Sequence, residues 1–441
     1  MANITAVLSS NGYISAVNSN PKKRLNYLVI FLLMLAGESV FFLPFVIARI
    51  FRPTMLTALE LNNTQLGNCF SIYGICALFS YFLGGFITDL VAPRKLMALA
   101  LLLTALGGFY MATYPNYTGM LVLYGYWGVT TILLFWAAMI KSTRIWGKED
   151  GQGKAFGLLE AGRGLVAASI GSIGVLLFSY LLIEGVENQT LVDIRAAYKT
   201  VVLFASTFVV FVAFLVYFLL RLDLTDSDSG DEKRNPLSHY WEVLKNPSVF
   251  LLMIIILTAY IGFKSTDLIS QYAHDVIGFS DVRSAGIGAL FLYMRPIIAV
   301  LIGFAADKMS AIYWVKIGFA TAIAGAGLFA FGVASTQIYV VFFSSTILLG
   351  MAIFGIRALY FALLKEGHIP VALTGLAVSL ISVTGYLPDI FMGPLSGYFL
   401  DNYPGEFGFK LMFGFLMICS AIGLIASQLF YRIAMPNRHE K

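Results

Sequence analysis

The chain has 441 residues, of which 59% are hydrophobic and 12% are charged, and its mean hydropathy is +0.82. Soluble globular domains carry about 25% charged residues, so this composition excludes a soluble protein and predicts an integral membrane protein. The formal net charge of +5 arises from basic segments between apolar runs, and it therefore gives no reason to expect a nucleic-acid partner.

Apolar runs of about 20 residues recur along the chain, and a helix of that length crosses a hydrocarbon core of about 30 Å. Runs such as residues 96–112 are apolar on every face, whereas strands of a membrane barrel alternate between apolar and polar side chains. The pattern predicts an all-α integral membrane protein with about twelve transmembrane helices. In chain order, we expect them at residues 25–48, 66–89, 95–113, 118–140, 154–181, 197–221, 248–273, 284–306, 312–333, 336–364, 371–400 and 408–431.

The basic loops predict the orientation, because positively charged loops stay on the cytoplasmic side of a membrane. They all fall on one side, at residues 22–24, 94–95, 141–154, 222–246, 308–316 and 432–441. Both termini are therefore predicted to be cytoplasmic, in a bacterial inner membrane, and the first apolar run is too long for a signal peptide and is expected to act as an anchor. Arg49 and Arg52 fall on the outer side, where we expect contact with lipid headgroups or, alternatively, steering of an anionic solute.

A polar segment divides the chain into two similar parts. We predict an N-terminal six-helix half at residues 1–221, a cytoplasmic linker at 222–247 with a short amphipathic helix in HYWEVLK (239–245), and a C-terminal six-helix half at 248–441. The second span of each half ends in a related turn, GGFITDLVAPRK (84–95) and GFAADKMS (303–310). Glycine allows close helix contact and the aspartate can cap a helix and pair with a nearby cation, so both turns are predicted to act in a gate.

Two halves of six spans, a central linker and GxxxD followed by basic residues resemble the major facilitator superfamily over essentially the whole chain. Gly85, Asp89, Arg94 and Lys95 match the signature positions, whereas Leu90 and Ala92 stand where a basic residue and a glycine are usual. The second copy, at Gly303, Asp307 and Lys308, is a weaker match. The resemblance implies a secondary transporter in which the two halves rock about a substrate site near the middle of the membrane.

Ionisable residues within the spans are the candidate functional residues, because an ionised group in lipid costs at least about 2.5–3.5 kcal/mol. Glu38 lies halfway along the first span, where it either serves the substrate or a proton or makes a structural hydrogen bond. Glu160 and Arg163 are three residues apart and can neutralise each other. Glu160 lies nearer the cytoplasmic end and is expected to join Arg144, Lys141 and Asp89 in the inner gate, while the deeper Arg163 is expected to reach the cavity.

The second half supplies further charges within its spans, at Lys264, Asp267, Arg295, Arg357 and Asp389. Lys264 and Asp267 again have the spacing of a helical pair, but Arg295 has no acid within one turn and precedes Pro296. Guanidinium groups bind carboxylate and phosphate in a forked geometry. The predicted substrate-binding residues are therefore Arg163, Lys264, Arg295 and Arg357, with Tyr293 as a ring or hydrogen-bonding contact, although aromatic residues such as Trp136, Tyr260, Tyr360 and Tyr386 also serve packing.

The acids Glu38, Asp389 and Asp267 are the predicted proton carriers. An apolar environment disfavours the ionised form of a carboxyl group and a neighbouring guanidinium favours it, so anion binding to that guanidinium can promote protonation. The predicted function is proton-coupled uptake of a small polar organic anion, such as a sugar acid, a sugar phosphate, a dicarboxylate or an amino acid, by a monomer.

Two alternatives stay open at this level, namely proton-coupled efflux of drugs or metabolites and uptake of amino acids or nucleosides. The segment GPLSG (393–397) is similar to a Gly-Pro motif that antiporters of the superfamily carry in their fifth span, but here it falls in the eleventh. An enzyme is not expected, since no HExxH, no paired Ser and His and no phosphate-binding glycine loop occurs at a suitable place. The four histidines lie in loops or tails, so no metal site and no cofactor are predicted.

Overall fold

The computed structural model describes residues 21–147, 152–182, 190–221, 246–335, 338–360, 362–367 and 371–434, and these residues form helices. The N-terminal bundle consists of α1 (Pro21–Phe41), η1 (Phe42–Val46), α2 (Ile47–Ile50), α3 (Arg52–Leu59), α4 (Asn63–Leu90), α5 (Pro93–Met111), α6 (Tyr117–Val129), η2 (Thr130–Trp136), α7 (Ala137–Gly147), α8 (Gln152–Leu181) and α9 (Leu191–Leu219). The C-terminal bundle consists of α11 (Pro247–Ser265), η4 (Thr266–Leu268), α12 (Ile269–Asp275), α13 (Asp281–Lys308), α14 (Ala311–Ala330), α15 (Tyr339–Leu359), α16 (Leu363–Glu366), α17 (Val371–Asn402) and α18 (Glu406–Ala434).

The prediction of an all-helical membrane protein is confirmed. Within the described residues, ten helical segments are long and apolar enough to cross a membrane, and α4 and α17, with 28 and 32 residues, coincide with the two other predicted spans. The predicted tenth span is interrupted, because α15 ends at Leu359 and the short α16 follows it. The linker helix expected at 239–245 lies outside the described residues.

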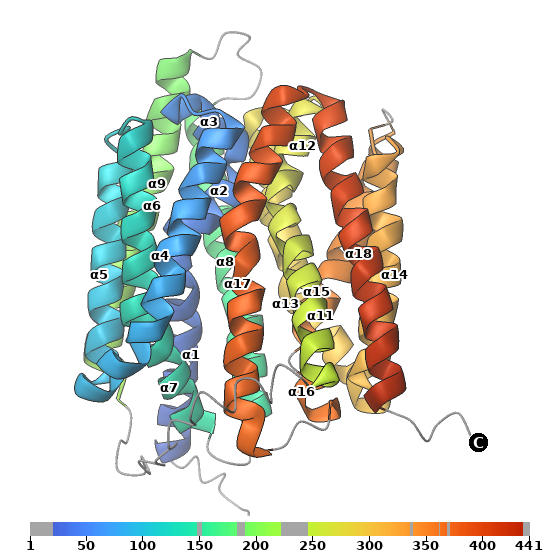
Figure 1. The fold of residues 1–441 in the computed structure, drawn as a ribbon. Coiled ribbons are helices and arrows are strands. Elements are labelled where there is room, and N and C mark those ends of the chain that lie inside the picture. Colours follow the sequence, from blue (N-terminus) through green and yellow to red (C-terminus); the bar gives the residue numbers. More distant parts are fainter. Residues whose placement is uncertain are drawn as a thin grey trace, which may run out of the picture.

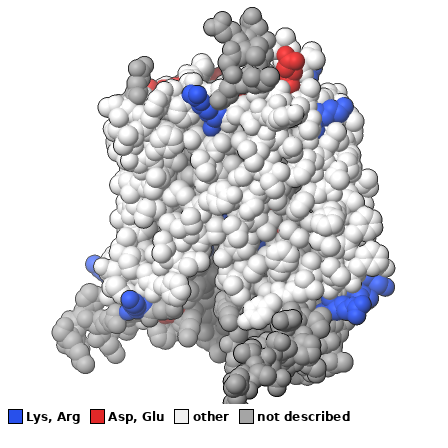
Figure 2. Space-filling view, turned by 180° about the vertical axis from the view of Figure 1, so that it is seen from behind, with Lys and Arg blue, Asp and Glu red and all other residues white. Residues whose placement is uncertain are grey.

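The two bundles stand side by side and meet along two helix pairs, α4 with α17 and α8 with α13 (Figure 1). Each bundle has its own apolar core, and the core of the N-terminal bundle also takes in Ala285, Ala289 and Leu292 of α13. The side view in Figure 2 is almost free of charged side chains between the two ends, as a surface that faces lipid must be. The fold therefore places a buried seam between the bundles, and several charged residues of the spans lie in it.

We call the end that carries the α4–α5 and α13–α14 turns the inner end, since its basic residues predict that it faces the cytoplasm. The end that carries α3 and α12 is the outer end (Figure 1).

Candidate functional site

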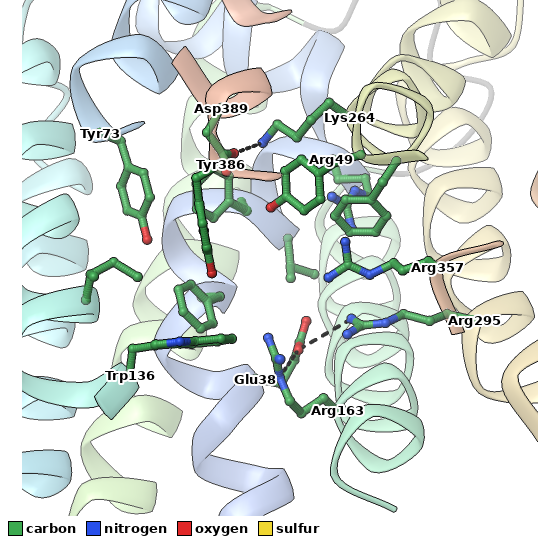
Figure 3. Close-up of a pocket in the computed structure, with 16 residues that line it drawn as sticks. Glu38, Arg49, Tyr73, Trp136, Arg163, Lys264, Arg295, Arg357, Tyr386 and Asp389 are labelled. Carbon is green, nitrogen blue, oxygen red and sulfur yellow. Dashed lines mark ion pairs between the residues drawn. The ribbon is translucent and has the colours of Figure 1, made fainter. Parts of the chain in front are cut away.

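A cavity lies in the seam between the bundles, with a volume of about 80 Å³. A single water needs about 10–15 Å³ on the same measure, so the cavity has room for several waters or part of a small solute. Five cations line it, together with two acids, and Figure 3 shows them around a central space. The cations are Arg49, Arg163, Lys264, Arg295 and Arg357, and the acids are Glu38 and Asp389.

Two breaks in regular helical geometry bring side chains to this cavity. The π-helical turns η1 and η2 interrupt the first and fourth spans, and Phe45, Val46, Ile132 and Trp136 of these turns line the cavity. A π-turn widens the helix by one residue and is frequent at functional sites. In η1 the turn also contains Pro44, which lacks the backbone N–H of a regular helix.

Four side chains of alternating charge form a closed ring at one side of the cavity. Glu160 accepts a hydrogen bond from Arg163 at 2.7 Å and another from Arg295 at 2.6 Å. Glu38 Oε2 lies 3.2 Å from Arg163 Nε and 3.6 Å from Arg295 Nη1, but it accepts no hydrogen bond from the described residues. Three members belong to the N-terminal bundle and Arg295 belongs to the C-terminal bundle, so the ring (Glu38, Arg163, Glu160, Arg295) ties the two together.

Two further ion pairs lie toward the outer end. Arg49 Nε donates to Asp267 Oδ1 at 2.5 Å, across the seam. Lys264 Nζ lies 2.7 Å from Asp389 and 3.7 Å from Asp267, so it links both acids. Lys264 also lies 4.4 Å from the centre of the Phe45 ring. All four charged groups are buried, so each is stabilised by its partner instead of by bulk water.

Arg357 differs from the other four cations of the cavity. Within the described part of the chain no carboxylate forms an ion pair with it, and its buried Nη1 atom has no hydrogen-bond partner. Its guanidinium carbon lies 3.8 Å from the centre of the Phe263 ring, which attracts the cation through its π-face. Figure 3 shows Arg357 between Arg49 and Arg295, directed into the cavity. The guanidinium of Arg357, half-buried in the structure, therefore keeps N–H donors that an oxyanion could accept from.

Aromatic side chains form the opposite wall. Tyr73, Trp136 and Tyr386 face the cations across the cavity in Figure 3. The Tyr386 hydroxyl is hydrogen-bonded to the hydroxyl of Tyr81 on α4, so the two bundles also touch through these rings. This wall offers flat apolar faces and tyrosine hydroxyls, whereas the other wall offers guanidinium groups.

The outer end of the seam is closed by contact of backbone with backbone. A Cβ atom added at Gly67 of α4 would lie 2.2 Å from the carbonyl oxygen of Gly393, and one added at Gly397 would lie 2.4 Å from Thr64 Cα. These glycines of α17 belong to the GPLSG segment, which therefore forms a tight helix contact of the small-xxx-small type.

Asp401 completes the outer closure. It accepts hydrogen bonds from the backbone N–H groups of Asn63 and Thr64 and from the Asn63 amide, and so caps the start of α4 from the other bundle. Partial burial raises the pKa of Asp401, but the hydrogen bonds from Thr64 and Asn63 outweigh it and hold the pKa below its ordinary value. Thr54 on α3 donates to Asp281 on α13 in the same layer.

The described residues show no comparable closure at the inner end of the seam. Figure 2 shows the described surface hollowed between the two bundles at its lower end. On this side 43% of the Glu160 side chain is exposed, whereas the Arg163 and Arg295 side chains are 8% and 7% exposed. Among the described residues, the cavity is therefore closed more tightly toward the outer end than toward the inner end.

The structure corrects expectations about three individual residues. Arg49 and Arg52 do not reach lipid headgroups, since they are 5% and 1% exposed, and Arg52 donates to the amide oxygen of Gln271 across the seam. Glu160 joins the ring with Arg295 across the seam, a pairing that was not expected, and its place in the inner gate with Arg144, Lys141 and Asp89 stays a prediction. Tyr293 does not line the cavity but pairs with Ser172, because two residues along a helix rotate a side chain about 200° away from Arg295.

The remaining predicted residues divide into two groups. Glu38, Arg163, Lys264, Arg295, Arg357 and Asp389 all line the cavity, and Asp267 contacts two of its cations. Arg94 and Arg144 are exposed at the inner end. Gly85, Asp89 and Asp307 lie on α4 and α13, but their side chains fall outside the described set, and their role in a gate stays a prediction.

Comparison with known proteins agrees with this architecture. A family model described as Major Facilitator Superfamily matches residues 27–392. The inner membrane protein YihN of Escherichia coli is 26% identical over 416 residues, 93% of this chain and 96% of that protein. The inner membrane protein YqcE of the same organism is 26% identical over 385 residues, 85% of this chain and 87% of that protein.

Solved structures show the same fold. A bacterial homologue of the human lysosomal transporter Spinster, in an inward-facing and unoccupied conformation, superposes with a TM-score of 0.69 at 13% identity, covering 94% of this chain and 98% of that one. The nucleoside transporter NupG gives a TM-score of 0.67 at 15% identity, covering 94% and 99% of the two chains.

Proposed function

Because the chain belongs to the major facilitator superfamily, and is therefore a secondary transporter in the membrane and not an enzyme, we propose that its cargo is a small organic anion. One observation carries this proposal, namely the cation Arg357, which lines the cavity without an acid partner among the described residues. An unpaired charge in such a place is costly unless an anion visits it.

Arg357 is suited to hold the charged end of the cargo. Phe263 lies against its guanidinium at 3.8 Å, and the buried Nη1 atom retains unused N–H groups. A carboxylate or a similar oxyanion can accept from these donors without breaking any existing ion pair. Arg295, by contrast, already donates to Glu160. We therefore propose that the acidic group of the cargo binds Arg357 first and that Arg295 makes an additional contact.

The aromatic wall is suited to the rest of the cargo. Trp136, Tyr73 and Tyr386 present ring faces and hydroxyl groups opposite Arg357. Ring faces pack against the C–H surface of a sugar or an aromatic ring, and tyrosine hydroxyls pair with hydroxyl groups. We therefore propose a cargo that carries an acidic group on a small polar or cyclic body.

Alternating access is proposed to occur by rocking of the predicted halves, residues 1–221 and 248–441, about the cavity. The contacts that close the outer end, such as those of Gly67 with Gly393, must separate before cargo can enter from that side. In the same movement the inner opening beside Glu160 must close, and the predicted gate at Gly85, Asp89, Arg94 and Arg144 lies on that side.

Proton coupling is proposed to act through the acids that hold the cavity cations. Protonation of Asp267 removes the partner of Arg49 and weakens the outer closure. Lys264 then remains with Asp389, its nearer acid. Glu38 is held by ionic contacts alone, without a hydrogen bond from the described residues, so it can exchange a proton when a cargo anion attracts Arg295 away from the ring.

A pair of chemically matched ligands tests the anion proposal. Binding of a hexuronate and of the corresponding neutral hexose is measured on the purified full-length protein, followed by flux of whichever ligand binds into proteoliposomes with and without an inward proton gradient. The proposal expects the acid to bind more tightly than the hexose and expects the gradient to accelerate its uptake.

Two outcomes would contradict parts of this proposal. Equal binding of the acid and the hexose removes the anion assignment, and uptake that ignores the proton gradient removes proton symport. Efflux of drugs or metabolites, the first alternative, predicts accumulation against the opposite gradient.

A neutral nucleoside is the second candidate, since the aromatic wall also suits a base and a ribose. NupG, which has the same fold, is a nucleoside transporter. Nucleoside binding that is unaffected by Arg357→Gln would favour this candidate. Binding of an acid that depends on Arg357 excludes it.

A further inference from the structure

The charges of the described residues around the cavity do not balance. Five cations line it, and four acids contact them, since Glu160 and Asp267 join Glu38 and Asp389 through ion pairs. Five positive and four negative charges leave a net charge of +1. Among the described residues of the cavity, the surplus resides on Arg357, because each of the other four cations is within ion-pair distance of an acid.

The existing ion pairs are held too tightly to supply a second free cation. Arg49 lies 2.5 Å from Asp267, Lys264 lies 2.7 Å from Asp389, and Arg295 lies 2.6 Å from Glu160. Each of these contacts is at or below the length of a charge-assisted N–H···O hydrogen bond, about 2.7–2.9 Å. Breaking one to accommodate more negative charge would leave a carboxylate of the protein without its cation in a partly dehydrated site, which is unfavourable.

On the basis of the proposed function, we infer that the cavity selects a cargo with a single negative charge. A monoanion brings the site to neutrality, with its acidic group on Arg357. A dianion leaves an uncompensated negative charge beside Glu38 and Asp389, and it binds well only when a proton accompanies it. The site thus favours carboxylates, sulfate esters and phosphodiesters over phosphate monoesters, which carry a charge of about −1.5 to −2 near neutral pH.

Two esters of one sugar distinguish the effect of ligand charge on affinity from the effect of ligand shape. Glucose 6-sulfate and glucose 6-phosphate have the same hexose body and similar tetrahedral headgroups, but at pH 7.5 the first has one negative charge and the second has nearly two. Dissociation constants are measured for both esters and for glucose on the full-length protein in nanodiscs. For the wild type, the sulfate ester is expected to bind about tenfold more tightly than the phosphate ester, because an unmatched unit charge within several ångströms changes affinity by at least that factor at an effective dielectric near 20.

Variants that change the charge of the cavity make the test specific. Glu160→Gln and Asp389→Asn each raise the net charge to +2 and are expected to shift the preference toward the phosphate ester by about tenfold. Glu160 is the milder site, because its side chain is 43% exposed, and Asp389→Asn provides an independent second variant. The control is Glu60→Gln, which removes an acid at the exposed outer surface, paired with Arg195, and it should leave the preference unchanged.

The outcomes distinguish this inference from the function on which it rests. Tighter binding of the phosphate ester by the wild type, or an unchanged preference in both acid variants, overturns the charge selection but leaves anion transport standing. If neither ester binds better than glucose, the anion proposal itself fails and the inference fails with it.

Discussion

The two ends of the seam are held in different ways. At the outer end, α4 and α17 touch at Gly67 and Gly393 with no side chain between them, and Asp401 caps α4 from the opposite bundle. On the inner side of the ring, no hydrogen bond or ion pair between described residues joins the bundles. The outer end is therefore held by close helix contact and hydrogen bonds, whereas the described residues of the inner end show no such closure. A transporter that works by alternating access must open the outer end while it closes the inner end. Substitutions at the outer end should therefore shift the equilibrium between the outward-closed and outward-open conformations.

The largest effect on the closure of the outer end is expected for Gly67→Ala, because α4 and α17 leave no space for a side chain at Gly67. Gly67→Ala places a methyl group 2.2 Å from the Gly393 carbonyl oxygen, and a forced fit of this kind costs about 1–3 kcal/mol. The equilibrium should move toward an open outer end by about 5- to 150-fold. Labelling from outside of a cysteine placed in the cavity measures this shift.

A matched glycine controls for the added methyl group. A Cβ at Gly414 of α18 meets nothing within 4 Å, so Gly414→Ala should label like the wild type. If Gly67→Ala is labelled from outside no faster than Gly414→Ala, the outer closure does not depend on contact between the helices.

A smaller effect is expected from the ion pair in the same layer. Arg49→Gln removes the partner of Asp267, which retains only the 3.7 Å contact with Lys264. Because both charges become hydrated when the outer end opens, we expect a shift toward the open end of about tenfold, less than the full cost of breaking a buried pair. Glu60→Gln, which removes an exposed acid paired with Arg195, is the control, and an equal response of the two variants would contradict a role for Arg49 in closure.

The cap on α4 predicts a dependence on external pH. The pKa of Asp401 is lowered in the closed form, so its carboxylate stabilises closure above the ordinary aspartate pKa of about 3.9. This contribution is lost as the pH falls through the lowered pKa. Outside labelling of the cavity should therefore rise a few-fold below about pH 4. Asp401→Asn should show the raised labelling at all pH values, and a wild-type pH response in this variant would exclude Asp401 as its source.

The smallest effect is expected at the aromatic contact. Tyr386→Phe removes the hydroxyl that pairs with Tyr81 but keeps the ring in the cavity wall. A single neutral hydrogen bond contributes about 0.5–1.5 kcal/mol, so transport and labelling should change by about two- to tenfold. A loss as large as that of Gly67→Ala would show that the hydroxyl pair, and not the helix contact, controls closure.

Much of the fold was predictable because hydrocarbon imposes strict conditions on a sequence. Spans of about 20 apolar residues and one-sided basic loops have few interpretations, and the predicted spans coincide with long helices. The π-turns η1 and η2 were not predictable, since no residue type dictates the extra residue in a turn. The end of α15 at Leu359 was also missed, because the apolar pattern continues beyond it.

The sequence predicted which charged residues line the cavity, but it did not predict which of them form ion pairs. Charges within spans had to face the seam, so Glu38, Arg295 and Arg357 were found from depth alone. Partners across the seam are set by tertiary packing, and for that reason the ion pair of Glu160 with Arg295 was not predicted. The sequence contained one signal for the pairing of Arg49 with Asp267. These residues are 218 positions apart, the same separation as Asp89 and Asp307, so they occupy equivalent places in the two repeats. A twofold relation about the membrane normal brings such places together.

The central claim is that Arg357 holds the negative group of the cargo, and its most direct test is the affinity of one anionic ligand for three forms of the protein. The dissociation constant of a hexuronate, or of whichever acid binds the wild type, is compared for the wild type, Arg357→Gln and Arg195→Gln. A hydrogen bond to a charged group contributes about 1.5–3 kcal/mol, so Arg357→Gln should bind about 10- to 150-fold more weakly, while Arg195→Gln should match the wild type. Undiminished binding of the acid by Arg357→Gln would contradict the account.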